Sequence, residues 1–340
     1  SVLTALYFHT LGPGDVVAVK AQAAPAFYAI QYLLGRLPAE ALTTLRAFGG
    51  LQAYPSRRKN PEIVDLSTGS MGLGAVAATF GALATRYLGD HFGVRHPERF
   101  IVLVGDAELD EGNVWEALLE ESVATLGNLL WIVDLNRQSL DRVAPDARRH
   151  QLRQMFAANG WHVIALRWGG RLRALFEAPG GGRLRQHLEA MSNTEYHALL
   201  RCPPAAARKI LVTSSDGAPD PAIEALLSRI ADDDLPALCA DVGGHDLAAI
   251  LEALDEAEGQ GDRPSVILAD TIKGWGLPLA ADPGNHGALL TTAQIEAFRA
   301  ACGVAPGEEW QAFPPGSPEA ALIRRRPALF SAPAPVREAI

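Results

Sequence analysis

The sequence predicts an α/β protein with a parallel sheet flanked by helices. Two apolar runs, residues 100–104 and 129–135, are typical of buried strands, and a helical segment at 111–126 separates them. Strands that alternate with helices in this way form parallel sheets. The chain has 340 residues, of which 48% are hydrophobic and 20% charged, so it can bury a substantial core.

The segments before residue 100 are expected to be mainly helical. Residues 1–48 are predicted to form helices broken at Gly12-Pro13-Gly14, with a short strand in 15–20 and a helix that ends at Gly35. Residues 69–89 form a long run of small residues with a Gly-rich start, which predicts a helix that can approach a ligand or another helix closely.

The segments after residue 135 are expected to complete the sheet and to add a C-terminal tail. Further strands are expected within 161–169 and 264–270, whereas the Asp- and Gly-rich segment 231–246 is predicted to form surface loops. The first domain therefore spans 1–290. The remainder, 291–340, is predicted to contain one helix followed by a Pro-rich extended arm.

The net charge and the cysteine content argue against several classes of protein. The formal net charge of −9 gives the chain no electrostatic reason to bind nucleic acid or an anionic membrane. No run has the length of a membrane-spanning helix. Cys202, Cys239 and Cys302 lie far apart and are odd in number, which argues against a disulfide framework and indicates a reducing, cytoplasmic location.

Potential metal ligands follow the two central strands. Asp106 lies after the first strand, within Gly105-Asp106-Ala107, and Asn136 lies after the second. Open α/β sheets bind ligands at the carboxyl ends of their strands. Carboxylate and amide oxygens suit Mg²⁺, which completes its shell with phosphate, so the pattern indicates a cofactor with a diphosphate. Alternatively, Asp106 only caps a helix that begins at Glu108.

The Gly-rich start of the predicted helix has two interpretations. Its glycines, Gly69, Gly72 and Gly74, do not follow the G-x-G-x-x-G order, and no convincing strand precedes them, which disfavours a nicotinamide cofactor. Backbone amides at such a helix start can face an anion. The other interpretation is close helix packing.

Two further groups are candidates for proton transfer or contact with a partner. Lys273 and His286 both follow the strand at 264–270, and a histidine in a loop can exchange protons near neutral pH, although many loop histidines are only exposed. The acidic residues between 108 and 121 suit a solvated helix N-terminus. Among these acidic residues, Glu111 is the candidate for contact with a partner.

Several segments, in order, resemble the homodimeric-type first component of the bacterial pyruvate dehydrogenase complex, with transketolase as the wider relative. They are Pro25-x-x-Tyr28 with Gly35-Arg36-Leu37, Ser70-Met71-Gly72-Leu73-Gly74, GDAELDE, Asn136-x-Gln138-x-Leu140-Asp141, NGWHVIALRWG, GGHD at 243–246, and TIKGWG. The resemblance covers nearly the whole chain. It implies the diphosphate domain of the thiamine diphosphate-binding fold, followed by the Pro-rich arm.

The resemblance also implies a set of site residues. Asp106, Asn136 and the backbone carbonyl of Gln138 would hold Mg²⁺, which bridges to thiamine diphosphate. Glu111 would lie at a subunit interface near both active sites, and His286 would lie in a mobile active-site loop; these two are the catalytic candidates. The residues expected to contact the cofactor are Lys20, Gln22, Ser70, Met71, Gly72, Gly105, Asp106, Ala107, Glu108, Asp134, Asn136 and Lys273.

The chain departs from the family pattern near the cofactor. Gln22 replaces a histidine and cannot shuttle a proton as histidine does. Lys20 stands where the pyruvate dehydrogenase component has Gln, Asp134 where it has Asn, and Ala107 where the motif has Gly.

The resemblance implies a partner. In the family the arm leads into a pyrimidine-binding domain that activates the cofactor, and the sequence ends at Ile340, where that domain would begin. We therefore expect a second subunit with that domain, in an α₂β₂ assembly. The expected reaction is decarboxylation of a 2-oxo acid with acyl transfer to a lipoyl or carrier protein. The alternatives are ketol transfer from a ketose and a non-catalytic subunit derived from this fold.

Overall fold

A parallel sheet forms the centre of the computed structural model, which describes residues 1–94, 99–146, 148–213 and 217–326. In these residues, five strands pair in the order β1-β2-β3-β7-β6, all parallel. The strands are β1 (Val16–Val19), β2 (Phe100–Gly105), β3 (Leu129–Leu135), β6 (His162–Leu166) and β7 (Ser265–Asp270). The predicted fold class is confirmed, and a strand lies in each of the predicted segments. A small antiparallel pair, β4 (Gln138–Ser139) and β5 (Arg142–Val143), follows β3.

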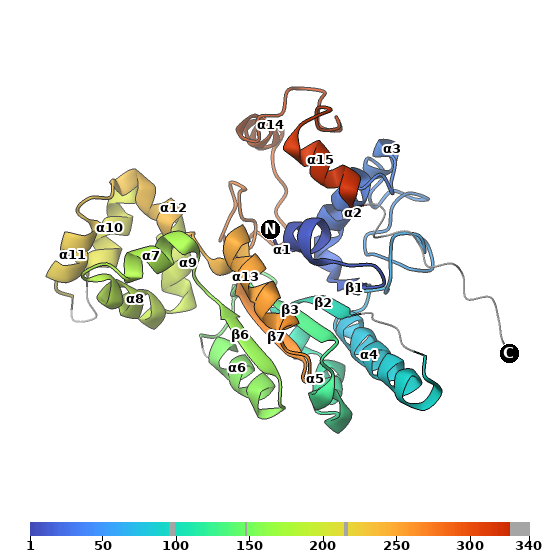
Figure 1. The fold of residues 1–340 in the computed structure, drawn as a ribbon. Helices are drawn as coiled ribbons and strands as arrows, with labels where there is room; N and C mark the ends of the chain where they lie inside the picture. Colours follow the sequence, from blue (N-terminus) through green and yellow to red (C-terminus); the bar gives the residue numbers. More distant parts are fainter. Residues whose placement is uncertain (95–98, 147, 214–216, 327–340) are drawn as a thin grey trace.

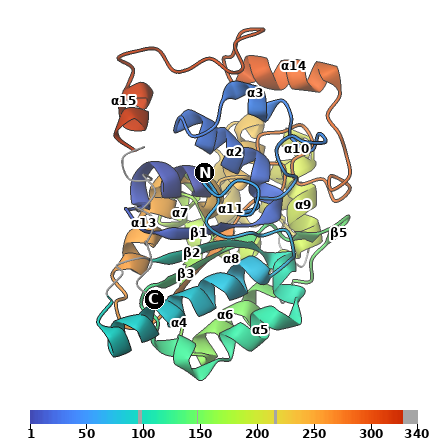
Figure 2. The same cartoon turned by 90° about the vertical axis from the view of Figure 1, so that its right-hand side faces the viewer.

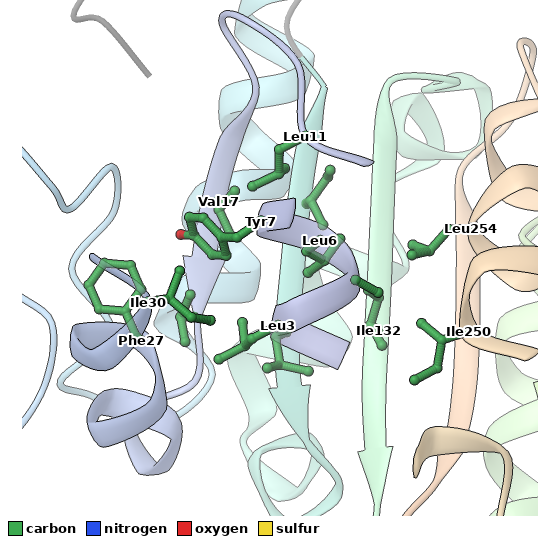
Figure 3. Packing of buried hydrophobic residues seen from close by; sticks show 14 of the residues in the cluster. Leu3, Leu6, Tyr7, Leu11, Val17, Phe27, Ile30, Ile132, Ile250 and Leu254 are labelled. Carbon is green, nitrogen blue, oxygen red and sulfur yellow. The ribbon is translucent and has the colours of Figure 1, made fainter. Parts of the chain in front are cut away.

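Helices cover both faces of the sheet (Figure 2). Successive side chains of a strand point to opposite faces. Accordingly, Ile101 and Leu103 of β2 pack with α1 (Val2–Ala5), α2 (Ala24–Leu33) and α13 (Leu247–Glu258), as Figure 3 shows for part of this cluster. Val102 and Val104 face the other side. There the sheet packs against α4 (Leu73–Phe92), α5 (Gly112–Leu118) and α6 (Arg148–Ala158). Because both faces of the sheet are buried, its strands consist of nearly continuous apolar runs.

Helix α4 packs closely on the sheet because its inner face consists of small residues. Ala75, Ala78 and Ala82 are buried there. A Cβ atom at Gly81 would lie 2.6 Å from the ring of Phe100, so only glycine permits this approach. The close approach expected of these small residues is made to the sheet, and their expected contact with a ligand stays a prediction.

A lobe of short helices lies beside the β6 edge of the sheet (Figure 1). Its helices are α7 (Gly170–Phe176), α8 (Gly181–Ala190), α9 (Asn193–Arg201), α10 (Pro204–Val212), α11 (Pro221–Leu227) and α12 (Leu235–Cys239). They enclose a core of their own, which includes Trp168 and Tyr196. The predicted surface loops at 231–246 are wrong, because α12 is helical and Val242 is only 1% exposed.

Two further segments differ from the prediction. The helix expected over 111–126 is divided into α5 and a 3₁₀ helix (Glu121–Thr125), because the Glu120 side chain accepts a hydrogen bond from the Ser122 amide and starts a new turn. The tail contains α14 (Thr292–Ala301), as predicted, and also α15 (Pro318–Arg325). The Arg326 side chain then donates to the carbonyls of Tyr7 (2.8 Å) and Leu11 (2.7 Å).

The rest of the predicted arm, residues 327–340, lies outside the described residues. The short helix α3 (Ala39–Leu42) completes the N-terminal region. Among the described residues, no helix combines the length and apolar character needed to cross a membrane.

Candidate cofactor site

The predicted site residues gather around a cavity of about 1010 Å³ at the carboxyl ends of the central strands. This is the edge of an open parallel sheet where ligands bind. The predicted residues that line the cavity are Lys20, Gln22, Met71, Gly105, Asp106, Ala107, Glu108, Asp134, Asn136, Gln138, Lys273 and His286. Residues from distant parts of the chain therefore converge on one cavity.

Three predicted residues do not line this cavity. Ser70 and Gly72 lie at the start of α4, where Gly72 is the N-cap. Glu111 is exposed at the N-cap of α5, and its Cβ lies 3.2 Å from the position that a Cβ on Gly72 would take. Its expected role at a subunit interface stays a prediction.

Asp106 is a buried carboxylate at the tip of β2. It begins a 3₁₀ helix (Asp106–Asp110), and its Oδ1 accepts a hydrogen bond from the Ala107 amide at 2.9 Å. Burial, followed by repulsion from Asp134, raises the pKa of Asp106 to about 7, although Lys20 opposes the rise. The positive charge of Lys20 is therefore not sufficient to stabilise the ionised form of the buried Asp106 carboxylate. A bound divalent cation would supply the missing positive charge.

Asn136 and Gln138 form a turn at the tip of the adjacent strand. Asn136 Oδ1 accepts a hydrogen bond from the Gln138 amide at 2.9 Å, and Arg137 between them has a left-handed backbone with φ of 62°. An amide oxygen has two acceptor sites, so Asn136 retains one for a metal. The donor set of Asp106, Asn136 and a backbone carbonyl fits a hard cation such as Mg²⁺.

Glu108 connects the tip of β2 to the start of α4. Its Oε1 accepts a hydrogen bond from the Gly105 amide at 3.0 Å, and its Oε2 accepts one from the Gly72 amide at 3.1 Å. The anion that faces the Gly72 amide in this structure is therefore the Glu108 carboxylate. This brace holds the Gly-rich turn against the cavity wall.

Substituting Gly72 with Ala is expected to lower the free energy of unfolding by about 1–3 kcal/mol or more. Gly72 has φ of 76°, and an added Cβ would lie 2.7 Å from Val114 Cγ2 and 2.9 Å from Asn113 Oδ1. Urea unfolding measures the change. Gly182→Ala is the matched control, because its Cβ would meet no atom within 4 Å, and helical alanine should stabilise this position slightly. Equal stability of Gly72→Ala and the native chain would contradict the steric account.

The two departures at Lys20 and Asp134 compensate each other. The Lys20 ammonium forms an ion pair with Asp134, which also accepts a hydrogen bond from the Thr271 hydroxyl. Burial disfavours the charged form of Lys20, but the charge and hydrogen bond of Asp134, together with the charges of Asp106 and Glu108, raise the Lys20 pKa. The pair thus adds a hydrogen-bonded contact to the cavity wall without adding net charge.

Lys273 and His286 lie next to each other at the rim of the cavity. Lys273 Nζ donates to the Leu140 carbonyl at 2.9 Å and lies 3.4 Å from His286 Nδ1. Burial lowers the pKa of Lys273. His286 is exposed, as many loop histidines are, and its expected catalytic role stays a prediction.

His245 is a cavity residue that the sequence reasoning did not select. Its Nε2 accepts a hydrogen bond from the Ile272 amide at 2.9 Å, and its ring stacks on Trp275 with centroids 4.6 Å apart. Burial lowers the pKa of His245 to about 4, so the imidazole is neutral at physiological pH. The GGHD segment at 243–246, noted for its resemblance, was the signal that could have identified it.

Comparisons with known proteins agree with this geometry. The family model "Transketolase, thiamine diphosphate binding domain" matches residues 17–186 and 236–314. The chain is similar to the "Pyruvate dehydrogenase E1 component" of Escherichia coli (strain K12), with 31% identity over 279 residues that cover 80% of this chain and 31% of the relative. The Mycobacterium tuberculosis protein of that name is 31% identical over 283 residues, 78% of this chain and 29% of the relative.

Solved structures show the same fold. A transketolase from Leishmania mexicana superimposes with a TM-score of 0.64 and 19% identity, covering 97% of this chain and 40% of that one. The chain thus spans about a third of the length of the curated relatives, at 31% of the E. coli protein. Matched by the family model over more than half of its length, the chain belongs to the transketolase family and contains its thiamine diphosphate binding domain.

Proposed function

We propose that this chain is one subunit of a two-component thiamine diphosphate enzyme and binds the Mg²⁺-diphosphate end of the cofactor. The observation that carries the proposal is the position of Asp106 and Asn136 at adjacent strand tips in one cavity, with a carboxylate that lacks a sufficient cation. When bound, thiamine diphosphate supplies the nucleophilic carbon and the electron sink for cleaving a bond beside a carbonyl group.

The residues of the cavity have distinct roles in this proposal. Asp106, Asn136 and the Gln138 carbonyl hold Mg²⁺. Lys273 adds positive charge at the rim, where a diphosphate or an anionic substrate would need it. His286, beside Lys273, gives or takes a proton on the substrate side.

We further propose that a partner subunit with the pyrimidine-binding domain covers the face next to α4, in an α₂β₂ assembly. The outer face of α4 carries an exposed apolar row, Leu73, Phe80, Tyr87 and Leu88, and Met71 extends it to the cavity. A row of this kind marks a surface that another protein covers. Glu111 lies beside the start of the row, which supports its expected place at an interface.

Among reactions, decarboxylation of a 2-oxo acid with acyl transfer is the first candidate. The relatives with 31% identity are named pyruvate dehydrogenase E1 components. The acyl acceptor would be a lipoyl group or a carrier-protein thiol. Transketolase-type transfer of a two-carbon ketol unit is the second candidate, because the family model and the structural neighbours are transketolases.

Reconstitution with a subunit that carries a pyrimidine-binding domain tests the proposal. We expect the pair to release carbon dioxide from pyruvate, whereas cleavage of xylulose phosphate would favour the second reaction. Calorimetry with thiamine diphosphate and Mg²⁺ is run with and without the partner. An absence of cofactor binding in both cases would overturn the proposal and favour a non-catalytic subunit.

A further inference from the structure

A second cavity, of about 860 Å³, lies on the α6 side of the sheet, between the strand ends and the helical lobe. Because side chains alternate along a strand, Asp134 of β3 faces the first cavity while Leu135 lines the second. Residues of α7, α8 and α9 form the outer wall. Residues 187–235 of this lobe fall outside the family-model match, whereas most residues that line the cavity, including Arg137, Arg149 and Arg167, lie inside it.

Arginines dominate the charged lining of this second cavity. The arginines that line it are Arg137, Arg148, Arg149, Arg153, Arg167, Arg173 and Arg185, and the acids are Asp106, Asp146, Glu177, Glu189 and Glu195. Several acids already have partners. Asp146 accepts a hydrogen bond from the Asn193 amide, Glu195 caps α9, and Glu189 accepts one from Arg185 at 3.0 Å.

Three of these arginines, which we call the arginine triad, have too little anionic charge around them. Arg137 and Arg149 both pair with the same oxygen of the fully buried Asp270, with Arg137 Nη2 at 3.0 Å. Arg167 lies 3.8 Å from Glu189, and its Nε is buried without a hydrogen-bond partner among the described residues. Burial and the charges of Arg167 and Arg137 lower the pKa of Arg149 to about 8. An anion among these guanidinium groups would relieve that repulsion.

Aromatic rings hold two members of the triad in place. The Arg137 guanidinium lies 4.0 Å from the ring centroid of Tyr196, and that of Arg167 lies 4.6 Å from Trp168. Tyr196 is itself anchored by its hydroxyl, which donates to the Cys239 carbonyl at 2.6 Å. Stacking on the flat face of a guanidinium leaves its N–H edges free to donate hydrogen bonds.

We infer that this second cavity binds a small molecule that bears a phosphate group, held by Arg137, Arg149 and Arg167. Fixed guanidinium groups donate paired, charge-assisted hydrogen bonds to phosphate oxygens. The cavity volume lies within the range of small-molecule sites. The site is separate from the proposed cofactor site, although Asp106 lines both cavities and Arg148 donates to its carbonyl at 3.3 Å. Binding here could therefore influence the metal site.

Titration of the chain with inorganic phosphate tests this inference, with chloride at matched ionic strength as the reference. The buffer contains EDTA and no thiamine diphosphate, so the result does not depend on the proposed function. We expect the native chain to bind phosphate by calorimetry, and Arg149→Met and Arg167→Met to weaken binding about tenfold or more. Arg263→Met is the matched control, because Arg263 is exposed and far in sequence from the triad, and it should leave binding unchanged.

Folding of the variants is checked by thermal unfolding. Arg149→Met removes a charge that Arg137 and Arg167 repel, and Asp270 keeps its ion pair with Arg137, so the midpoint without phosphate should stay close to that of the native chain. Phosphate should raise the midpoint of the native chain and of Arg263→Met but not that of Arg149→Met. Arg149→Lys keeps the positive charge but lacks the planar guanidinium group that donates paired hydrogen bonds. This variant should therefore bind phosphate more weakly than the native chain. Phosphate binding no stronger than chloride binding, or equal affinity in the native chain and the Arg149 and Arg167 variants, would overturn the inference.

Discussion

Replacing Asp106 with Ala is expected to abolish magnesium-dependent binding of thiamine diphosphate, with an affinity loss of at least about 100-fold, or about 2.7 kcal/mol. Asp106 is the only carboxylate among the three proposed metal ligands, which are completed by Asn136 and the Gln138 carbonyl. Without it, the remaining proposed ligands would offer Mg²⁺ only neutral oxygens, because the Asp134 carboxylate at the tip of β3 is already paired with Lys20. Calorimetric titration with the cofactor, in the presence and absence of Mg²⁺, measures the loss.

The matched control for this experiment is Asp262→Ala. Asp262 is exposed in the connection before β7, so its removal changes the net charge by the same amount without touching the cavity. It should bind the cofactor like the native chain. If Asp106→Ala binds with native affinity, Asp106 is not a metal ligand and the proposed function loses its main support.

The conservative variant Asp106→Asn is expected to be more stable than the native chain when no metal is present. Burial raises the pKa of Asp106 to about 7, which means that the folded protein disfavours the ionised form. The stabilising contribution of the protonated group is complete below its unfolded pKa, near about 4, and is lost as the pH rises through about 7. Asn is neutral at every pH, so the variant should gain up to about 4 kcal/mol at pH 8 and almost nothing near pH 4.

Urea unfolding of both chains in EDTA, at several values between those two pH extremes, measures this difference. Added Mg²⁺ and cofactor should stabilise the native chain and leave Asp106→Asn unchanged, because ligand binding to the folded state alone adds to its stability. If the native chain equals or exceeds the variant in stability at pH 8 without metal, the carboxylate is not held in the unfavourable environment described here.

The sheet and the position of Asp106 and Asn136 at its strand tips could be predicted from the sequence because their signals are local. Each strand is a short apolar run, and Asp106 and Asn136 follow directly after two of them. The pairing of β2 with β3 then places both residues at one edge. The small residues of α4 are likewise a local signal, because they permit its close contact with the sheet at Gly81.

Other features depend on contacts between distant residues, which no local pattern records. Lys20 and Asp134 are 114 residues apart in the sequence, and only the fold shows that they pair. His245 lies in a Gly-rich segment whose composition predicts a surface loop. The lobe helices are short and lie far apart along the sequence, so no local pattern predicts their shared core around Trp168 and Tyr196.

The position of the metal tests the central claim most directly. A crystal structure with Mg²⁺ and thiamine diphosphate should show the ion about 2.0–2.1 Å from oxygens of Asp106, Asn136 and the Gln138 backbone, and in contact with both phosphate groups of the cofactor. The account would be contradicted if the diphosphate were bound elsewhere, or if it were bound in this cavity while Asp106 and Asn136 were turned away from the ion.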